Sequence, residues 1–277
     1  MRFTKYVWVI LVIPAFSFAQ GWLPVGARSM SLGNATVALE DVWAYHHNPA
    51  AMAGLKGTHV GVSYENRFLL KDLQTQGLVI GQQVGKGMLS LGAQFYGHQL
   101  YRTNRLGLGY SLKLGELLSA GVQVNYQGVN IRDYGKKGTV TAELGLLAKL
   151  NENLHFGFSI FNLNRARFSD FQDDRLATYM RAGLRYQVSK KLMLLAEAEK
   201  EVESKIRPKG ALEYGAGEKF FLRLAAVGNP MELSFGMGFK FGKQLRLDFG
   251  SAWNQLLGWS PHAGLTWQLG KETVEHE

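Results

Sequence analysis

The sequence predicts an all-β protein: a transmembrane antiparallel β-barrel of about 14 strands with an N-terminal plug, or hatch, segment inside its lumen. Three observations support this fold class. Beyond residue 56, apolar and polar residues alternate with a period of two, and short and long connections take turns between the alternating stretches. The chain also begins with an export signal. Together these features are typical of barrels from bacterial outer membranes.

Residues 1–19 have the three parts of a secretory signal peptide. Arg2 and Lys5 form a positive start, residues 6–16 form an apolar run, and residues 17–19 give the small-x-small pattern of a cleavage site. The run is too short to span a bilayer comfortably, and no charged stop-transfer cluster follows it. We therefore predict a signal peptide and a protein of the outer membrane of a Gram-negative bacterium.

The composition limits the function classes. The chain has 33 glycines without a collagen period, which indicates tight turns and closely packed strands. It has no cysteine, so disulfides and thiolate metal sites are excluded. The net charge of +9 is not clustered in a stripe, so we predict no nucleic-acid partner, whereas anionic lipid headgroups of the outer membrane suit it.

The alternating stretches read as strands with one apolar face. For example, Leu106, Leu108 and Tyr110 share one face, while the opposite face of such stretches carries Gly, Ser, Asn, Gln and charged residues. A soluble antiparallel sandwich or barrel would also alternate, with its apolar face inward. The export signal, the long uninterrupted apolar rows and the charges that can pair inside a lumen favour the membrane barrel.

Connection lengths set the topology. Short connections such as residues 85–87 and 151–153 alternate with longer ones such as residues 65–72 and 162–175. One strand between each pair of breaks gives about 14 strands over residues 57–270, with both chain ends on the periplasmic side. Residues 271–277 are then a polar periplasmic tail.

The stretch before the strands has a different character. Residues 26–53 are rich in small residues, are interrupted by Pro49 and lack strict alternation. A wall of 14 strands encloses more space than its own side chains fill, so we predict that residues 20–56 form a plug inside the lumen. Asn48 is expected to cap or turn the chain, and Pro49 to stop any helix behind it.

Several motifs of the chain resemble a known family. Gly26-Ala27-Arg28, Leu32-Gly33-Asn34-Ala35 and Asn48-Pro49-Ala50 are similar to the N-terminal segment of the FadL-like (OMPP1) outer-membrane proteins, most closely of their PorV/PorQ branch. Further similar stretches, in residues 157–163, 177–184 and 212–224, extend the resemblance over nearly the whole mature chain. The family fold has 14 strands. The plug positions that we single out are Gly26, Ala27, Gly33, Asp41, His46, His47, Asn48, Pro49 and Ala50.

The resemblance implies one function and leaves another open. It implies a non-enzymatic accessory or scaffold subunit of a type IX secretion or surface-assembly machine, with other outer-membrane or periplasmic proteins as partners. The alternative is a FadL-like channel for hydrophobic small molecules, which should show an apolar pocket beside the plug and a kinked or open strand. The sequence offers few inward apolar positions for such a ligand: Leu147, Phe161, Met193, Leu195 and Phe221.

Inward charges are predicted to pair across neighbouring strands. We expect Arg181 and Arg185 to lie within ion-pairing distance of Glu197 and Glu199. Such pairs hold a barrel wall together or, in the functional alternative, tune a pore. Glu213 is expected to face Arg223, Arg246 and Asp248 to lie on neighbouring strands or adjacent turns, and Glu40 and Asp41 to contact luminal arginines.

No catalytic, metal or cofactor site is predicted. His59, His98, His155 and His262 are scattered over separate strands, and the chain has no Gly-x-Ser-x-Gly motif. The adjacent His46 and His47 have no carboxylate or further histidine at metal-site spacing. We therefore expect these two histidines to hydrogen-bond within the plug or to the wall.

Overall fold

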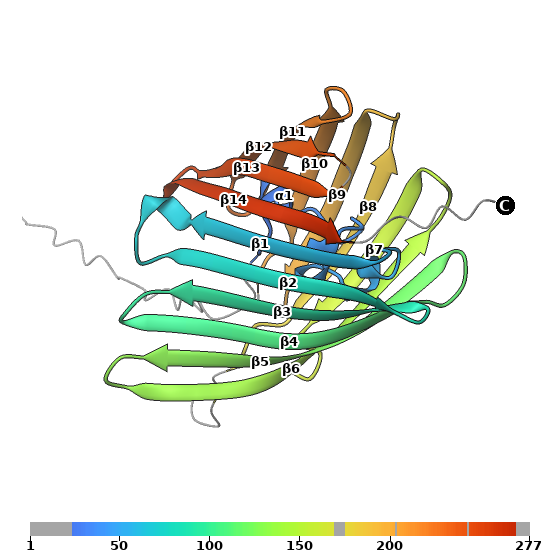
Figure 1. Cartoon of the computed structure of the whole chain (residues 1–277). Coiled ribbons are helices and arrows are strands. Elements are labelled where there is room, and N and C mark those ends of the chain that lie inside the picture. Colours follow the sequence, from blue (N-terminus) through green and yellow to red (C-terminus); the bar gives the residue numbers. More distant parts are fainter. Residues whose placement is uncertain (1–23, 169–174, 203, 243, 270–277) are drawn as a thin grey trace, which may run out of the picture.

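The chain folds into a closed β-barrel in which every strand is antiparallel to both of its neighbours. The computed structural model describes residues 24–168, 175–202, 204–242 and 244–269, so the predicted signal peptide and the tail at 271–277 lie outside the described residues. Neighbours in sequence are neighbours in the wall, and β1 pairs with β14 to close it (Figure 1). The predicted count of about 14 strands is confirmed. The strands are β1 (Thr58–Asn66), β2 (Gln74–Val84), β3 (Gly87–Gly97), β4 (Tyr101–Lys113), β5 (Leu118–Ile131), β6 (Gly135–Lys149), β7 (Leu154–Phe161), β8 (Tyr179–Gln187), β9 (Leu192–Glu201), β10 (Arg207–Gly215), β11 (Phe220–Val227), β12 (Glu232–Phe241), β13 (Leu245–Asn254) and β14 (Gly258–Leu269).

Connections divide the barrel into two ends. We call the end where β1 starts and β14 finishes the turn end, and the opposite end the loop end. Connections at the turn end are short, as at residues 85–86 and 188–191, whereas those at the loop end include residues 67–73 and 162–178. The loop end also has short connections, such as residues 98–100 between β3 and β4 and residues 132–134 between β5 and β6.

The two faces of the wall differ as the alternation predicted. On β2, Leu78 and Ile80 point outward with 39% of each side chain exposed, while Val79 between them is fully buried inside. The outer face carries exposed apolar side chains on all sides of the barrel. In the described residues no helix is long and apolar enough to cross a membrane.

One seam of the wall has a short strand ladder. β6 pairs with β7 only from Leu144 to Lys149, because β7 ends at Phe161. Beyond that point the side chain of Asn164 forms the hydrogen bonds to β6 in place of a strand. Its Oδ1 accepts from the backbone N–H of Ala142 and its Nδ2 donates to the carbonyl of Val140, both at 2.9 Å. The connection after β7 thus continues the wall next to β6.

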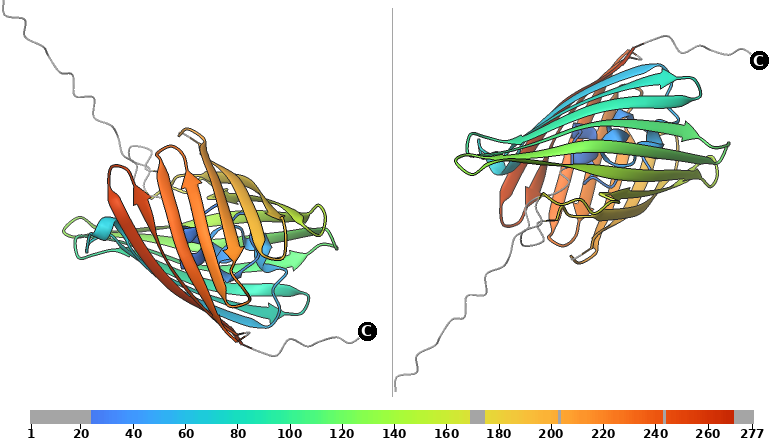
Figure 2. Two further views of the ribbon diagram at one scale, coloured as in Figure 1. Left: turned by 90° about the horizontal axis from the view of Figure 1, so that it is seen from above. Right: turned by 90° about the horizontal axis from the view of Figure 1, so that it is seen from below.

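Residues 24–56 lie inside the ring of strands (Figure 2). They form the short helix α1 (Ala27–Ser31) and the 3₁₀ turns η1 (Val42–His46) and η2 (Pro49–Met52). Outside this segment, the 3₁₀ turn η3 (Arg67–Leu69) follows β1. Small side chains such as Ala27, Ala50 and Ala51 are fully buried. The segment therefore occupies the middle of the lumen.

Candidate functional site: the occupied lumen

The N-terminal segment, residues 24–56, is seated on glycines of the wall. A Cβ added at Gly61 would come 2.9 Å from the Trp43 ring, and one at Gly264 would come 3.0 Å from the Cβ of Ala27. At Gly121 it would meet the backbone of Pro49 and Ala50. The segment therefore fits only because these wall positions lack a side chain. Inward glycines that touch it are Gly61, Gly77, Gly81, Gly92, Gly107, Gly121, Gly145, Gly157, Gly183, Gly236, Gly250 and Gly264.

Our sequence interpretation assigned the glycines to turns and strand packing and missed this role. The signal was present, because many glycines fall on the polar face of the alternating stretches, near the middle of a strand. The sequence alone did not say what would fill the space that they leave.

One side of the segment is apolar. Val42, Trp43 and Met52 belong to one buried cluster with Val79 of β2 and Met88 of β3. Leu147 of β6, predicted as an apolar lining residue, belongs to the same cluster. A second cluster joins Leu32, Ala35 and Leu39 of the segment to Met193 and Leu195 of β9.

Apolar wall positions are thus buried beneath the segment. The two remaining predicted lining residues lie against cations: the guanidinium carbon of Arg105 is 5.2 Å from the Phe161 ring centroid, and that of Arg246 is 4.9 Å from the Phe221 ring centroid. Lys240 also lies over Phe221, at 4.9 Å. In this conformation the wall's apolar positions serve to hold the segment.

The other side of the segment is held by charges, first of all through Arg28. Its Nη2 lies 2.6 Å from Glu213 Oε1 on β10, its Nε donates to Glu213 Oε2 at 3.0 Å, and its Nη1 lies 3.1 Å from Asp41 Oδ2. Asp41 also caps η1, accepting from the N–H of Trp43. The predicted contact of Asp41 with an arginine of the wall is wrong, because Arg28 of the segment itself lies closer.

Glu213 is shared by further arginines of the wall. It accepts from Arg223 Nε at 2.6 Å and from Arg246 Nη2 at 3.1 Å. Asp248 Oδ1 in turn lies 2.7 Å from Arg223 Nη2 and 3.0 Å from Arg246 Nε. The predicted Glu213–Arg223 pair is present in register between β10 and β11. The expected placement of Arg246 and Asp248 on neighbouring strands is wrong, since both lie on β13.

We call these six residues the Arg28 cluster: Arg28, Asp41, Glu213, Arg223, Arg246 and Asp248. It contains three guanidinium groups and three carboxylates, so its formal charges balance. Burial opposes the charge on Arg28, but the attraction of Glu213 and Asp41 outweighs it and raises the pKa of Arg28 above its ordinary value. Arg28 therefore stays charged in its buried position, and it anchors the segment to β10 through Glu213.

Glu40 makes a second charged contact with the wall. Its carboxylate lies 3.3 Å from His155 Nδ1, 3.4 Å from Lys149 Nζ and 3.5 Å from Arg185 Nη1. The predicted contact of Glu40 with a luminal arginine is present. The expected pairing of Arg185 with Glu197 and Glu199 is wrong, because the register sets Arg185 opposite Leu195, nearer to Glu40.

The third charged contact surrounds Lys209 of β10. Its Nζ lies 2.8 Å from Glu197 Oε1 and 2.7 Å from Glu199 Oε2, and it donates to the carbonyl of Asn34. Arg181 lies 3.4 Å from Glu199, as predicted. Our interpretation missed Lys209, although alternation along β10 places it on the inward face. Glu197 also accepts from the N–H of Val37, so this cluster holds the segment's backbone.

The middle of the segment is held by hydrogen bonds at the predicted positions. Asn48 caps η2 by accepting from the N–H of Ala50, and its Nδ2 donates to the carbonyls of Val37 and Leu146 at 2.6 and 2.9 Å. Pro49 is the first residue of η2. His47 contacts the carbonyl of Val25 through Nε2, and its own carbonyl accepts from Ser159 Oγ.

Two glycines of the segment have backbone angles that favour glycine. Gly26, before α1, has φ 106°, and Gly33, after it, has φ 58°. Their missing side chains also matter, since a Cβ would come 2.6 Å from the Trp43 ring at Gly26 and 2.8 Å from Val227 at Gly33.

His46 is buried between aromatic rings. Its ring centroid is 4.8 Å from that of Tyr45 and 6.1 Å from that of Trp43. Burial, and secondarily the positive charge of Arg105, holds the pKa of His46 well below its ordinary value of 6.5. Burial lowers the pKa of His47 as well, with Arg181 adding to the shift. Both imidazoles are therefore neutral, and among the described residues no group of three potential ligands could hold a metal ion.

A polar hollow of about 370 Å³ lies above the segment at the loop end. Pro24, Met30 and Asn34 of the segment contribute to its lining. The wall contributes charges of both signs, namely Glu65, Arg67, Glu199, Glu201, Lys205, Arg207, Lys209 and Glu232. Pro24 thus lies at the loop end while Leu269 lies at the turn end. The termini are outside the described residues, so the placement of both on one side stays a prediction.

Comparisons with known proteins identify the architecture. No family model and no curated protein matches the sequence. Solved structures do match. The CymD monoaromatic hydrocarbon channel has a TM-score of 0.72 at 12% identity and covers 91% of this chain and 100% of its own. The Ralstonia pickettii toluene transporter TbuX has a TM-score of 0.67 at 11% identity, covering 91% and 99%. A Pseudomonas aeruginosa FadL homologue has a TM-score of 0.60 at 14% identity, covering 90% and 98%. At these identities the likeness establishes a FadL-like barrel fold.

Proposed function

We propose that this chain is an outer-membrane channel of the FadL-like type, in which residues 24–56 are the plug that closes the lumen to small molecules. The observation that carries the proposal is the seating of this segment inside a closed barrel, on wall glycines and by three charged contacts. The apolar outer face supports the membrane location, because exposed rows such as Leu78, Ile80 and Leu91 need a non-aqueous covering.

The residues that line the lumen indicate the route of a transported molecule through the barrel. The hollow at the loop end is charged and polar, so it admits water and the polar part of a molecule. Beneath the segment the wall presents Val79, Met88, Leu147 and Met193, which are buried now and would be uncovered when the segment moves. The substrate class that suits both surfaces is a small hydrophobic molecule with a polar group. The hydrocarbon specificity named for CymD and TbuX supports the hydrophobic part.

The type IX accessory role implied by the sequence resemblance is the less favoured function. CymD and TbuX, two solved structures similar to this chain, are named as a channel and a transporter. The PorV/PorQ branch and its secretion partners have no support among the comparisons. No contact in the described part of the chain argues for a protein partner.

An engineered disulfide tests the plug. The chain has no cysteine, so Ala27→Cys with Gly264→Cys creates a single possible bridge between the segment and β14. The two Cβ positions are 3.0 Å apart, close to the separation that a disulfide spans. We expect uptake of a radiolabelled monoaromatic hydrocarbon, by cells that carry the oxidised variant in their outer membrane, to fall several-fold and to recover with reductant.

The matched control is Ala196→Cys with Gly210→Cys, a facing pair on the outer side of β9 and β10 that links two strands without touching the segment. Its oxidation should leave uptake unchanged. Equal uptake by the oxidised and reduced forms of the Ala27→Cys, Gly264→Cys variant would contradict the proposal that residues 24–56 are the plug of the channel. If wild-type cells take up the probe no faster than cells without the protein, the channel itself is rejected.

A further inference from the structure

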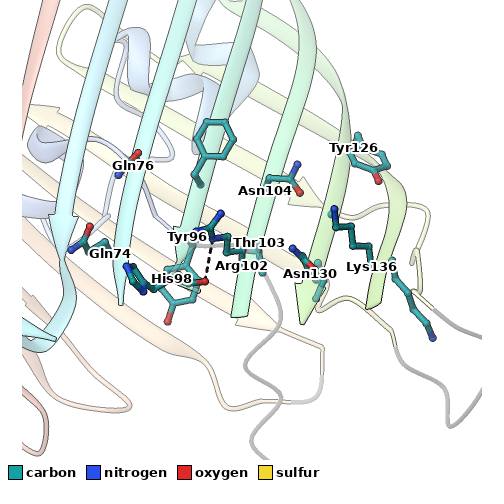
Figure 3. Close-up of a pocket in the computed structure, with 15 residues that line it drawn as sticks. Gln74, Gln76, Tyr96, His98, Arg102, Thr103, Asn104, Tyr126, Asn130 and Lys136 are labelled. Atoms are coloured by element: carbon teal, nitrogen blue, oxygen red, sulfur yellow. Dashed lines mark hydrogen bonds between the residues drawn. The ribbon is translucent and has the colours of Figure 1, made fainter. Parts of the chain in front are cut away.

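A second hollow, of about 540 Å³, lies on the outer face of the barrel at the loop end of β2 to β6. Its lining side chains include Gln76, Asn104, Tyr126 and Arg102 (Figure 3). The side chains that carry the groove, those of Gln76, Phe95, Arg102, Asn104, Tyr126, Asn130 and Lys136, share the outer face of the exposed Leu78 and Leu106, whereas Tyr96, Thr103, Val129 and Lys137 lie at the alternate positions of their strands.

Strand register builds the groove from two outward rows. In one row Phe95 faces Asn104, and Asn104 faces Gly128. In the next row, nearer the loop end, Arg102 faces Asn130, and Asn130 faces Lys136. Glycine makes the floor: Asn104 lies across Gly128 so closely that any side chain there would overlap its Oδ1. The polar groups are therefore fixed by the sheet.

The lining of the groove carries positive charge and no carboxylate, although Asp72 Oδ1 at its rim lies 3.3 Å from Nδ1 of the lining residue His98. Its lining includes Arg102, Lys136 and Lys137, and none of its lining residues is acidic. Arg102 is oriented by a bond from its Nε to the carbonyl of His98 at 3.2 Å, drawn as a dashed line in Figure 3. Within the described ranges neither Arg102 nor Lys136 forms an ion pair. Amide groups of Asn104 and Asn130 add donors between the two cations.

The groove lies where the apolar band of the wall ends. Outward residues toward the turn end are apolar, as in Leu106, Leu108, Val122 and Val124. Aromatic residues mark the boundary, with Phe95 and Tyr126 each 48% exposed. Aromatic girdles of membrane barrels lie at the level of the lipid headgroups, so the cations just beyond them face the headgroup layer.

We propose that this groove binds a phosphate group on the headgroup of a lipid in the leaflet at the loop end. Arg102 and Lys136 neutralise the phosphate, Asn104 and Asn130 donate to its oxygens or to adjacent hydroxyls, and Phe95 and Tyr126 contact the start of the acyl chains. Charge complementarity and the height of the groove in the wall favour a lipid over a soluble anion. The inference rests on the proposed membrane location but not on transport.

The test uses the full-length mature barrel in phosphatidylcholine nanodiscs that contain a small fraction of lipid A, a phosphorylated glycolipid. Retention of lipid A by the protein after extraction into detergent is measured by native mass spectrometry. The variant Arg102→Gln with Lys136→Gln should bind lipid A about 25-fold more weakly than wild type, from the usual contribution of each cation near an anionic membrane surface.

The matched control is Lys86→Gln with Lys190→Gln, two exposed lysines in turns at the opposite end. It should bind like wild type. Equal lipid A binding by the groove variant and wild type would overturn the inference, and so would loss of binding in the control to the same extent. Inorganic phosphate at millimolar concentration should not displace lipid A; if it does, the groove is a site for a soluble anion. Lipid binding is measured without flux, so its failure leaves the channel proposal untouched.

Discussion

The two sides of the N-terminal segment contact the wall through different interactions, apolar burial on one side and charged groups on the other. Toward β1 to β6 it buries apolar side chains such as Trp43 and Met52 against Val79, Met88 and Leu147. Toward β8 to β13 its apolar cluster with Met193 and Leu195 is smaller, and charged groups add to it, with Arg28 Nη2 2.6 Å from Glu213 Oε1. Apolar burial is strong but tolerates sliding, whereas the charged bonds are directional. The comparison indicates that the apolar side supplies affinity and the charged side fixes the position of the segment.

The largest effect is expected on the apolar side. Trp43→Ala should lower the stability of the docked segment by about 3–5 kcal/mol, because a large buried ring is lost and a cavity remains. Hydrogen exchange of residues 24–56 should become correspondingly faster. Trp259→Ala, on the outer face with 44% of the side chain exposed, is the control and should leave the exchange unchanged. If residues 24–56 of the Trp43→Ala variant exchanged as slowly as those of wild type, the apolar side would not supply the affinity of the segment.

A slightly smaller effect is expected on the charged side. Glu213→Gln leaves Arg28, Arg223 and Arg246 with the carboxylates of Asp41 and Asp248 alone, and should cost about 3 kcal/mol, as for other broken buried ion pairs. Hydrogen exchange of residues 24–56 measures this loss of stability of the docked segment.

Its control is Glu218→Gln, an exposed residue of the turn after β10, where the change should be close to zero. If Glu213→Gln exchanged as slowly as wild type while Trp43→Ala exchanged fast, the charged side would have no part in fixing the segment.

Substitution of a wall glycine tests the close fit between the wall and residues 24–56, on which both sides of the segment depend. Gly121→Val puts a side chain against the backbone of Pro49 and Ala50, which cannot move aside as a flexible side chain could, and should cost about 1–3 kcal/mol. Gly210→Val on the outer face is the matched control, because nothing lies within 4 Å of its added Cβ. Increased cleavage of the segment by protease in the first variant alone is expected. Equal resistance of both variants would show that the glycines do not create the seat.

The smallest effect is a pH dependence of the apolar side. Burial keeps the pKa of His46 far below 6.5, so the unfolded or released segment binds more protons than the docked one below that pH. The stabilising effect of a neutral His46 is present above pH 6.5 and is lost as the pH falls, by about 1 kcal/mol for each pH unit. Exchange of the segment should accelerate between pH 7 and 5.5 after correction for the intrinsic rate.

His46→Gln should weaken that dependence, leaving the part due to His47. The charged groups near these histidines are Arg105, Arg181 and Lys209, all on the wall. An unchanged pH profile in the variant would mean that His46 does not titrate on release.

The sequence was sufficient for the wall and for much of the segment. Period-two alternation determined which side of each strand faces out, since a one-residue slip would exchange the faces. It therefore placed Glu213 opposite Arg223, and Arg181 within ion-pairing distance of the carboxylates Glu197 and Glu199, correctly. It also identified Asn48 as a capping residue, because its side chain can bond to the backbone two residues further on. These are local or nearest-neighbour relations.

The sequence predicted a contact of Glu40 with a luminal arginine, but it could not identify which residues meet across the lumen. Glu40 pairs with Arg185, and Arg28 with Glu213, although 145 and 185 residues separate the partners along the chain. No periodicity relates the segment to a particular strand. The pairing of Arg185 was predicted wrongly for this reason: alternation gave its face, but the path of the segment decided which carboxylate was nearest.

By itself, then, the sequence determined about 14 strands with an apolar outer face and a separate small-residue segment before them, and it predicts export of the chain. Only the tertiary structure decided that inward glycines make the seat for that segment and that its two sides are held differently. The physical reason is that strand patterns are set by bonds and burial between neighbours, whereas the lumen brings together groups from every strand at once, and their distances depend on how the whole barrel closes.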